Sequence, residues 1–227
     1  MQGAREIQTR RVSRHTRGAG FFAATQQMGL FQQPEESTMH EISLGGTIRD
    51  YLSGEEVPST TYEEVRQALA RLMVEELGYP ADRLKAKVGV RFPVTWEEGA
   101  PEYCRVADLV AYGDDGRPLL VVIFCSGLPG TYDRETVAAA RLIPGGPAPL
   151  AVSTDTRDAV LLSVPDGQTL AQGPRALPRY DDLPGLCRDR FMEPLSGERL
   201  LRERRILYAY SEMLTSCCEG TCSPIPS

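Results

Sequence analysis

Two different spacings of hydrophobic residues, one helical and one strand-like, follow one another in the first half of the chain. Apolar residues at positions 65, 69, 72, 73 and 77 have the spacing of one helix face, so they predict a helix that lies on a core. The preceding residues 61–64 have the form of a capping box, with Thr61 as the N-cap and Glu64 at the third helical position. Between residues 87 and 94 polar and apolar residues alternate, which predicts a half-buried strand.

The remaining elements complete a recognisable order. Further strands are expected over 103–112, 119–125, 150–153 and 159–164, and helices over 133–143 and 197–214. A Gly-Asp-Asp-Gly-Arg-Pro run at 113–118 predicts a tight hairpin between two of these strands. The order of helix, three strands, helix and two strands predicts an α/β sandwich, with a mixed central sheet flanked by helices and a C-terminal helix.

Composition divides the chain into three parts. Residues 1–38 hold five arginines and three glutamates, a net charge of +2, and show no sustained period. We predict that they form a basic extension without fixed structure; an arm that contacts nucleic acid and an organellar transit peptide are the alternatives. Residues 39–165 are the predicted α/β core. Residues 166–227 combine a proline-rich connection, the last helix and a cysteine-containing tail.

Charge and hydropathy exclude some classes of protein. The net charge is −6, so the residues after 38 carry −8. That balance argues against a strongly basic nucleic-acid clamp. No stretch approaches the ~20 apolar residues of a membrane helix, and the first residues lack the pattern of a secretory signal. We therefore expect no membrane association and a cytoplasmic location.

Four segments carry a resemblance to a known family. They are Tyr62–Gln67 on the first helix, Gly78–Pro80 after it, Val106–Tyr112 on the second strand and Gly116–Val122 on the hairpin return. Over about residues 60–155 the chain resembles the N-terminal domains of type I restriction enzyme R subunits. These belong to the restriction-endonuclease-like, or PD-(D/E)xK, superfamily. The resemblance implies a restriction-endonuclease-like sandwich fold.

The resemblance also implies Mg²⁺-dependent phosphodiester cleavage. This chemistry uses an acid on the second strand, an acid on the third and a lysine two residues later, around one or two metal ions. Asp108 matches the second-strand acid and Glu64 matches an acid of the first helix. The third strand departs from the pattern, because Phe124 stands at the position of the acid and Ser126 at that of the lysine.

One strand carboxylate and one helical glutamate make a poor Mg²⁺ site. We therefore predict a degenerate nuclease fold that needs no cofactor. It would act as a module associated with nucleic acid or with a restriction or repair protein. The alternative is an active Mg²⁺-dependent nuclease whose missing roles are supplied by Glu135, Arg134 or Arg141 on the next helix.

Two features near the C-terminus allow further interpretations. Cys217, Cys218 and Cys222, with Cys187 as a fourth ligand, suggest a soft-metal or redox protein. The last helix carries several arginines, which form either a basic face for nucleic acid or an ordinary solvated surface. These arginines are Arg199, Arg202, Arg204 and Arg205.

The candidate acids also have ordinary structural explanations. Glu64 is fully explained by the predicted capping box with Thr61. Asp108 is explained by an ion pair with Arg105 or Arg91, because half-buried carboxylates are usually paired. The surroundings of Asp108 therefore decide between these interpretations.

Overall fold

A six-stranded mixed sheet organises the chain. The computed structural model describes residues 42–97, 102–125 and 127–214. Within them the strand order is β3-β4-β5-β6-β7-β8, with β5 and β6 parallel and all other neighbours antiparallel. The strands are β3 (Leu84–Pro93), β4 (Glu102–Tyr112), β5 (Pro118–Phe124), β6 (Leu150–Thr154), β7 (Ala159–Ser163) and β8 (Thr169–Gln172).

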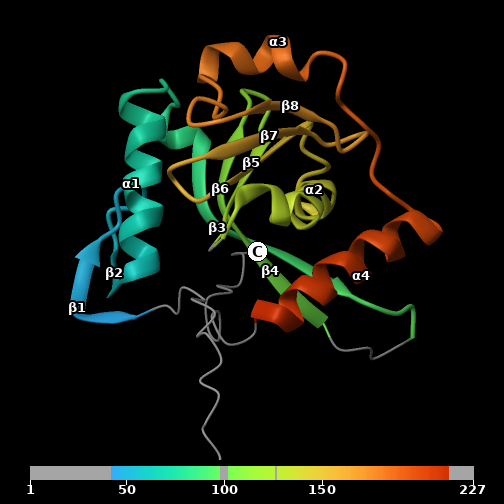
Figure 1. Ribbon diagram of the computed structural model, residues 1–227, viewed down its shortest axis with the longest axis horizontal. Helices are drawn as coiled ribbons and strands as arrows, with labels where there is room; N and C mark the ends of the chain where they lie inside the picture. Colours follow the sequence, from blue (N-terminus) through green and yellow to red (C-terminus); the bar gives the residue numbers. More distant parts are fainter. Residues whose placement is uncertain (1–41, 98–101, 126, 215–227) are drawn as a thin grey trace, which may run out of the picture. The chain divides into compact units, whose positions relative to one another are not determined.

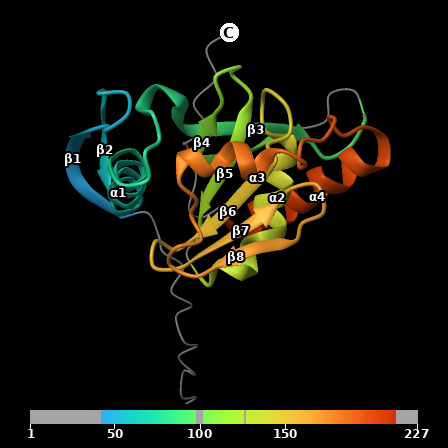
Figure 2. The ribbon, with the colours of Figure 1, turned by 90° about the horizontal axis from the view of Figure 1, so that it is seen from above.

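Helices cover both faces of this sheet. They are α1 (Thr61–Glu75), α2 (Asp133–Leu142), α3 (Leu183–Cys187) and α4 (Gly197–Leu214), with short 3-10 turns at Ala81–Arg83, Pro129–Tyr132 and Tyr180–Asp182. Helix α2 is the crossover between the parallel strands, and α4 lies beside it (Figures 1 and 2). The apolar side chains of α2 and α4 share one core with one sheet face, and those of α1 and α3 share a second core with the other.

A small hairpin precedes the first helix. Strands β1 (Ser43–Arg49) and β2 (Glu56–Thr60) pair antiparallel beside α1 (Figure 1). The carboxylate of Asp50 accepts the backbone N–H groups of Leu52 and Ser53 at 3.0 and 2.8 Å, which closes the turn between the strands. The hairpin therefore brings a buried carboxylate to the side of α1.

The predicted sandwich fold is confirmed. The predicted helix over 197–214 and the strands that follow the first helix agree with the structure within a few residues. The β1–β2 hairpin, β8 and α3 were not predicted, because glycines interrupt β1 and prolines surround β8 and α3. Residues 1–38, the predicted basic extension, lie outside the described part of the chain.

The predicted capping box is wrong by one residue. Thr60 is the N-cap of α1, and its side chain accepts the backbone N–H of Glu63 at 3.0 Å. Thr61 instead exchanges hydrogen bonds with Ile42 at the start of the hairpin. The sequence Thr-Thr-Tyr-Glu-Glu fits either register, and the structure uses the earlier one. On the helix that follows, Glu63 lies on the buried face and Glu64 is exposed.

A buried ion pair fastens α4 to α2. Arg141 Nη1 lies 2.7 Å from Glu203 Oε1, and both side chains are buried. The same guanidinium donates to the carbonyl oxygens of Val164 and Pro165 at 2.9 and 3.1 Å. Leu207, also fully buried, belongs to the core on this face. No helix in the described ranges is long and apolar enough to cross a membrane.

We expect Arg141→Ala to lower the free energy of unfolding by about 3 kcal/mol, because it leaves Glu203 buried without its cation. Urea denaturation followed by the fluorescence of Trp96 measures this loss. Arg157→Ala, which removes an exposed guanidinium, is the control and should change little. The double variant Arg141→Ala/Glu203→Ala should lose less than the sum of the single losses. Equal urea midpoints for Arg141→Ala and the wild type would contradict the assigned role.

Candidate functional site

Asp108 lies on β4 with its carboxylate directed at groups of the protein itself. The residue is 2% exposed. Its Oδ2 accepts the backbone N–H of Phe124 at 2.6 Å, and its Oδ1 accepts the hydroxyl of Tyr62 from α1. The backbone pairing between β4 and β5 ends at Leu109 and Val122. Beyond this pair, the N–H of Phe124 bonds to the side chain of Asp108. Both carboxylate oxygens therefore have a donor within the domain.

Burial dominates the ionisation of this pair. Loss of solvent raises the pKa of Asp108 above its ordinary value, although Arg105 and the two hydrogen bonds act in the opposite direction. Burial and the neighbouring carboxylate also raise the pKa of Tyr62 well above its ordinary value. The phenol therefore keeps its proton and remains a donor to Asp108.

A second cluster of charged side chains surrounds Glu63 on α1. Glu63 Oε1 accepts hydrogen bonds from Arg66 Nε at 3.0 Å and from Gln67 Nε2 at 3.2 Å. Arg66 also forms an ion pair with Asp50 of the hairpin turn. On the other side, Lys87 Nζ lies 2.7 Å from Glu63 Oε2. Burial alone would raise the pKa of Glu63, yet Arg66 and Lys87 together lower it.

Lys87 is the residue of β3 that lies opposite Asp108. The register, in which Val88 pairs with Ala107, places these two residues across from each other. Lys87 has a left-handed backbone with φ of 52°, which is unusual for a residue with a side chain in a strand. The alternation of residues 87–94 places Lys87 on the polar, solvent side of the strand. In the structure its ammonium group binds Glu63 instead.

Glu135 approaches the same region from α2. It is fully buried and forms an ion pair with Arg105 Nε. Arg105 also acts electrostatically on Asp108, so one guanidinium serves two buried carboxylates. Of the other relocation candidates, Arg134 is exposed and Arg141 binds Glu203.

Comparison with known families decides the kinship of this domain. The family model described as "Type I restriction enzyme R protein N terminus (HSDR_N)" matches residues 61–178, from the first residue of α1 to beyond β8. The chain belongs to the HSDR_N family. Neither the curated proteins nor the solved structures give a significant match.

The described residues of this HSDR_N domain do not fit the Mg²⁺ site that the resemblance to the PD-(D/E)xK superfamily implies. Both oxygens of Asp108 accept hydrogen bonds, and half-buried Phe124 lies where the resemblance leads one to expect the second acid. The neighbouring acids Glu63 and Glu135 are ion-paired. Among the described residues, no three His, Cys, Asp or Glu side chains form a group that could hold a metal ion.

The other predicted site residues lie apart from Asp108 or outside the description. Glu64 is exposed on α1. Ser126 and the three tail cysteines, Cys217, Cys218 and Cys222, lie outside the described residues. Cys187 is a buried free thiol whose pKa burial raises to about 11, which opposes thiolate chemistry.

Sequence reasoning missed Tyr62, which donates to Asp108, and the charged side chains of Asp50, Glu63, Arg66 and Lys87. Glu63 had a signal, since Thr60 and Glu63 form an equally good capping box. Arg66 and Lys87 had none, because Arg66 is buried against Asp50 of the hairpin, and Lys87, whose side chain is 27% exposed, reaches Glu63 from a left-handed position in β3.

We expect Asp108→Asn to gain stability relative to the wild type as the pH rises. The amide oxygen still accepts the Phe124 N–H and no charge is buried, whereas the Tyr62 hydroxyl loses the acceptor that the carboxylate provides at every pH. Because folded Asp108 holds its proton more tightly than the unfolded chain, ionising it costs stability as the pH rises above 3.8. The stability of the variant relative to the wild type should therefore be higher at pH 7 than in acid.

Urea denaturation of both proteins at neutral and acidic pH measures this difference. Glu64→Gln is the control for loss of an exposed carboxylate from the same region, and it should show no comparable pH-dependent gain. A wild type that gains stability over Asp108→Asn as the pH rises would contradict the assignment, since the carboxylate would then be favoured in its ionised form.

Proposed function

We infer that this HSDR_N domain does not cleave phosphodiester bonds and serves as a binding module. Its context would be a restriction or repair system, and the family supports the first of these. The observation that carries the proposal is the state of Asp108. Both of its oxygens accept hydrogen bonds from Tyr62 and Phe124, and burial raises its pKa.

The physical argument concerns what a metal ion would have to displace. Mg²⁺ is bound by ionised carboxylates and dehydrates reluctantly. Each carboxylate oxygen has a second lone pair, so a metal here would either share Asp108 with its two donors or displace the Tyr62 hydroxyl and leave a half-buried phenol without an acceptor, which costs about 1–3 kcal/mol. No second carboxylate compensates, because Glu63 and Glu135 already neutralise buried cations.

A second candidate function is a nuclease with relocated residues. It is favoured by Lys87, which lies across from Asp108 with a left-handed backbone of the kind often found at functional sites. In that case Glu63 would be the helix acid and Lys87 would stand in for the absent lysine of β5. The ion pair between Glu63 and Lys87 argues against this function, because the two charges neutralise each other and neither side chain is free for catalysis.

A cleavage assay separates the two candidates. We expect no cleavage of supercoiled DNA, single-stranded DNA or RNA by the full chain with Mg²⁺ or Mn²⁺ beyond that of Asp108→Asn. Cleavage by the wild type that falls about 100-fold or more in both Asp108→Asn and Lys87→Met would establish the nuclease instead. Glu64→Gln should leave any such cleavage unchanged, since its carboxylate is exposed on α1.

A further inference from the structure

Cys104 on β4 takes part in a disulfide bond. It is disulfide-bonded in the structure, whereas Cys125 and Cys187 are free thiols. The chain contains six cysteines, and the remaining three lie 113–118 positions after Cys104. Within one copy of the chain, elimination therefore leaves three cysteines of the C-terminal tail as partners for this bond: Cys217, Cys218 and Cys222.

The surroundings of Cys104 leave its sulfur accessible. The residue is half-buried near the start of β4. Its sulfur lies over Gly89 of β3, since a Cβ atom built on that glycine would be 3.2 Å from it. The backbone pairing of β4 with β5 covers residues 109–112. Among the described strands, the beginning of β4 therefore has a neighbour on its β3 side alone, and the edge beside Cys104 is open.

Helix α4 directs the tail toward this edge. The ring of Tyr208 on α4 lies 4.7 Å, centre to centre, from the ring of Tyr103, the residue before Cys104. Figure 1 shows the C-terminal part of α4 beside β4. From Tyr208 the helix continues for about 9 Å to Leu214, and the three residues from there to the first tail cysteine span up to ~10 Å.

The tail would have to pass around the open edge of β4. Side chains alternate along a strand, so Cys104 faces away from the side on which Tyr103 contacts α4. Neighbouring strands are only about 4.8 Å apart, so the detour around one strand is short. The reach of the tail is therefore sufficient for a bond with Cys104.

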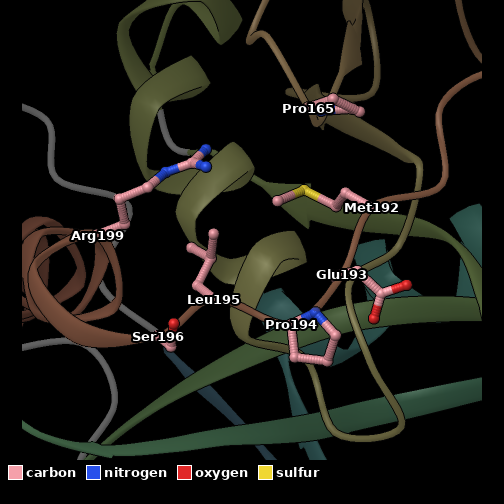
Figure 3. Close-up of a pocket in the computed structure, with 7 residues that line it drawn as sticks. All are labelled: Pro165, Met192, Glu193, Pro194, Leu195, Ser196 and Arg199. Carbon is pink, nitrogen blue, oxygen red and sulfur yellow. The ribbon is translucent and has the colours of Figure 1, made fainter.

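Such a bond would add a covalent attachment to α4. Non-covalent contacts hold this helix by its middle, through the ion pair of Glu203 with Arg141. Its first turn borders a hollow of about 360 Å³, where Arg199 and Met192 face each other (Figure 3). The start of α4 is thus less tightly packed than its middle, and a link at the other end would limit its separation from the sheet.

We propose that a disulfide between Cys104 and a tail cysteine is a redox-dependent clasp that holds α4 on β4. It forms by exchange with a small disulfide such as oxidised glutathione. One cysteine thiolate attacks the oxidant and displaces a thiolate, and the second attacks the mixed disulfide and displaces the other. The two cysteine protons pass to the released thiolates, so one protein disulfide and two small thiols result. Because Cys104 is half-buried, a thiol reductant can reach the bond and reverse the reaction.

Peptide mapping of the full chain tests the pairing. The protein is incubated with oxidised glutathione, its free thiols are blocked with N-ethylmaleimide in urea, and it is digested with trypsin without reductant. We expect residues 92–105 linked to residues 206–227 of the same chain, with Cys125 and Cys187 recovered as blocked thiols. Variants that retain one tail cysteine each, such as Cys217→Ser/Cys218→Ser, identify the partner.

Reduction should weaken the fold only when Cys104 is present. Dithiothreitol should lower the urea midpoint of the wild type by about 1 M, because the bond closes a loop of more than one hundred residues. Cys104→Ser is the control, and dithiothreitol should leave its midpoint unchanged.

Four results would each overturn the inference: Cys104 recovered as a blocked thiol, a bond from Cys104 to Cys125 or Cys187, a bond between two chains on a non-reducing gel, or a wild-type midpoint that dithiothreitol leaves unchanged. The mapping uses the wild type, so it decides the pairing even if Cys104→Ser fails to fold. None of these measurements depends on whether the domain cleaves nucleic acid.

Discussion

A buried carboxylate requires hydrogen-bond donors, and in this domain Asp108 obtains them from two different elements. The N–H of Phe124 comes from the neighbouring strand and the hydroxyl of Tyr62 from the first helix. This one side chain therefore ties β4, β5 and α1 together. In the proposed function these structural contacts compete with any metal ion for the same carboxylate.

The charged groups around Asp108 are also bound by other groups of the domain. Glu63 neutralises Arg66 and Lys87, and Glu135 neutralises Arg105. Each buried charge has an opposite partner, as the cost of desolvation demands. Acids and cations are thus gathered near the aspartate, but their mutual pairing makes them a structural network.

The fold was readable from the sequence, because alternation and apolar runs marked the strands. The absence of the third-strand acid at Phe124 stays a prediction, because it rests on the resemblance to the nuclease family. The network was not readable. Which of the two adjacent glutamates is buried depends on how α1 lies against the sheet and the hairpin, and Lys87 binds it from a left-handed position in β3. Such details depend on tertiary contacts, which the periodicity of hydrophobic residues in the sequence does not reveal.

The most direct test of this account is whether a divalent ion binds at Asp108. Crystals of the wild type grown with Mn²⁺ and measured near the manganese absorption edge would locate any such ion. The account predicts no anomalous peak beside the Asp108 carboxylate and an unchanged hydrogen bond from Tyr62. A peak within ligand distance of Asp108 and of either Glu63 or Glu135 would contradict it.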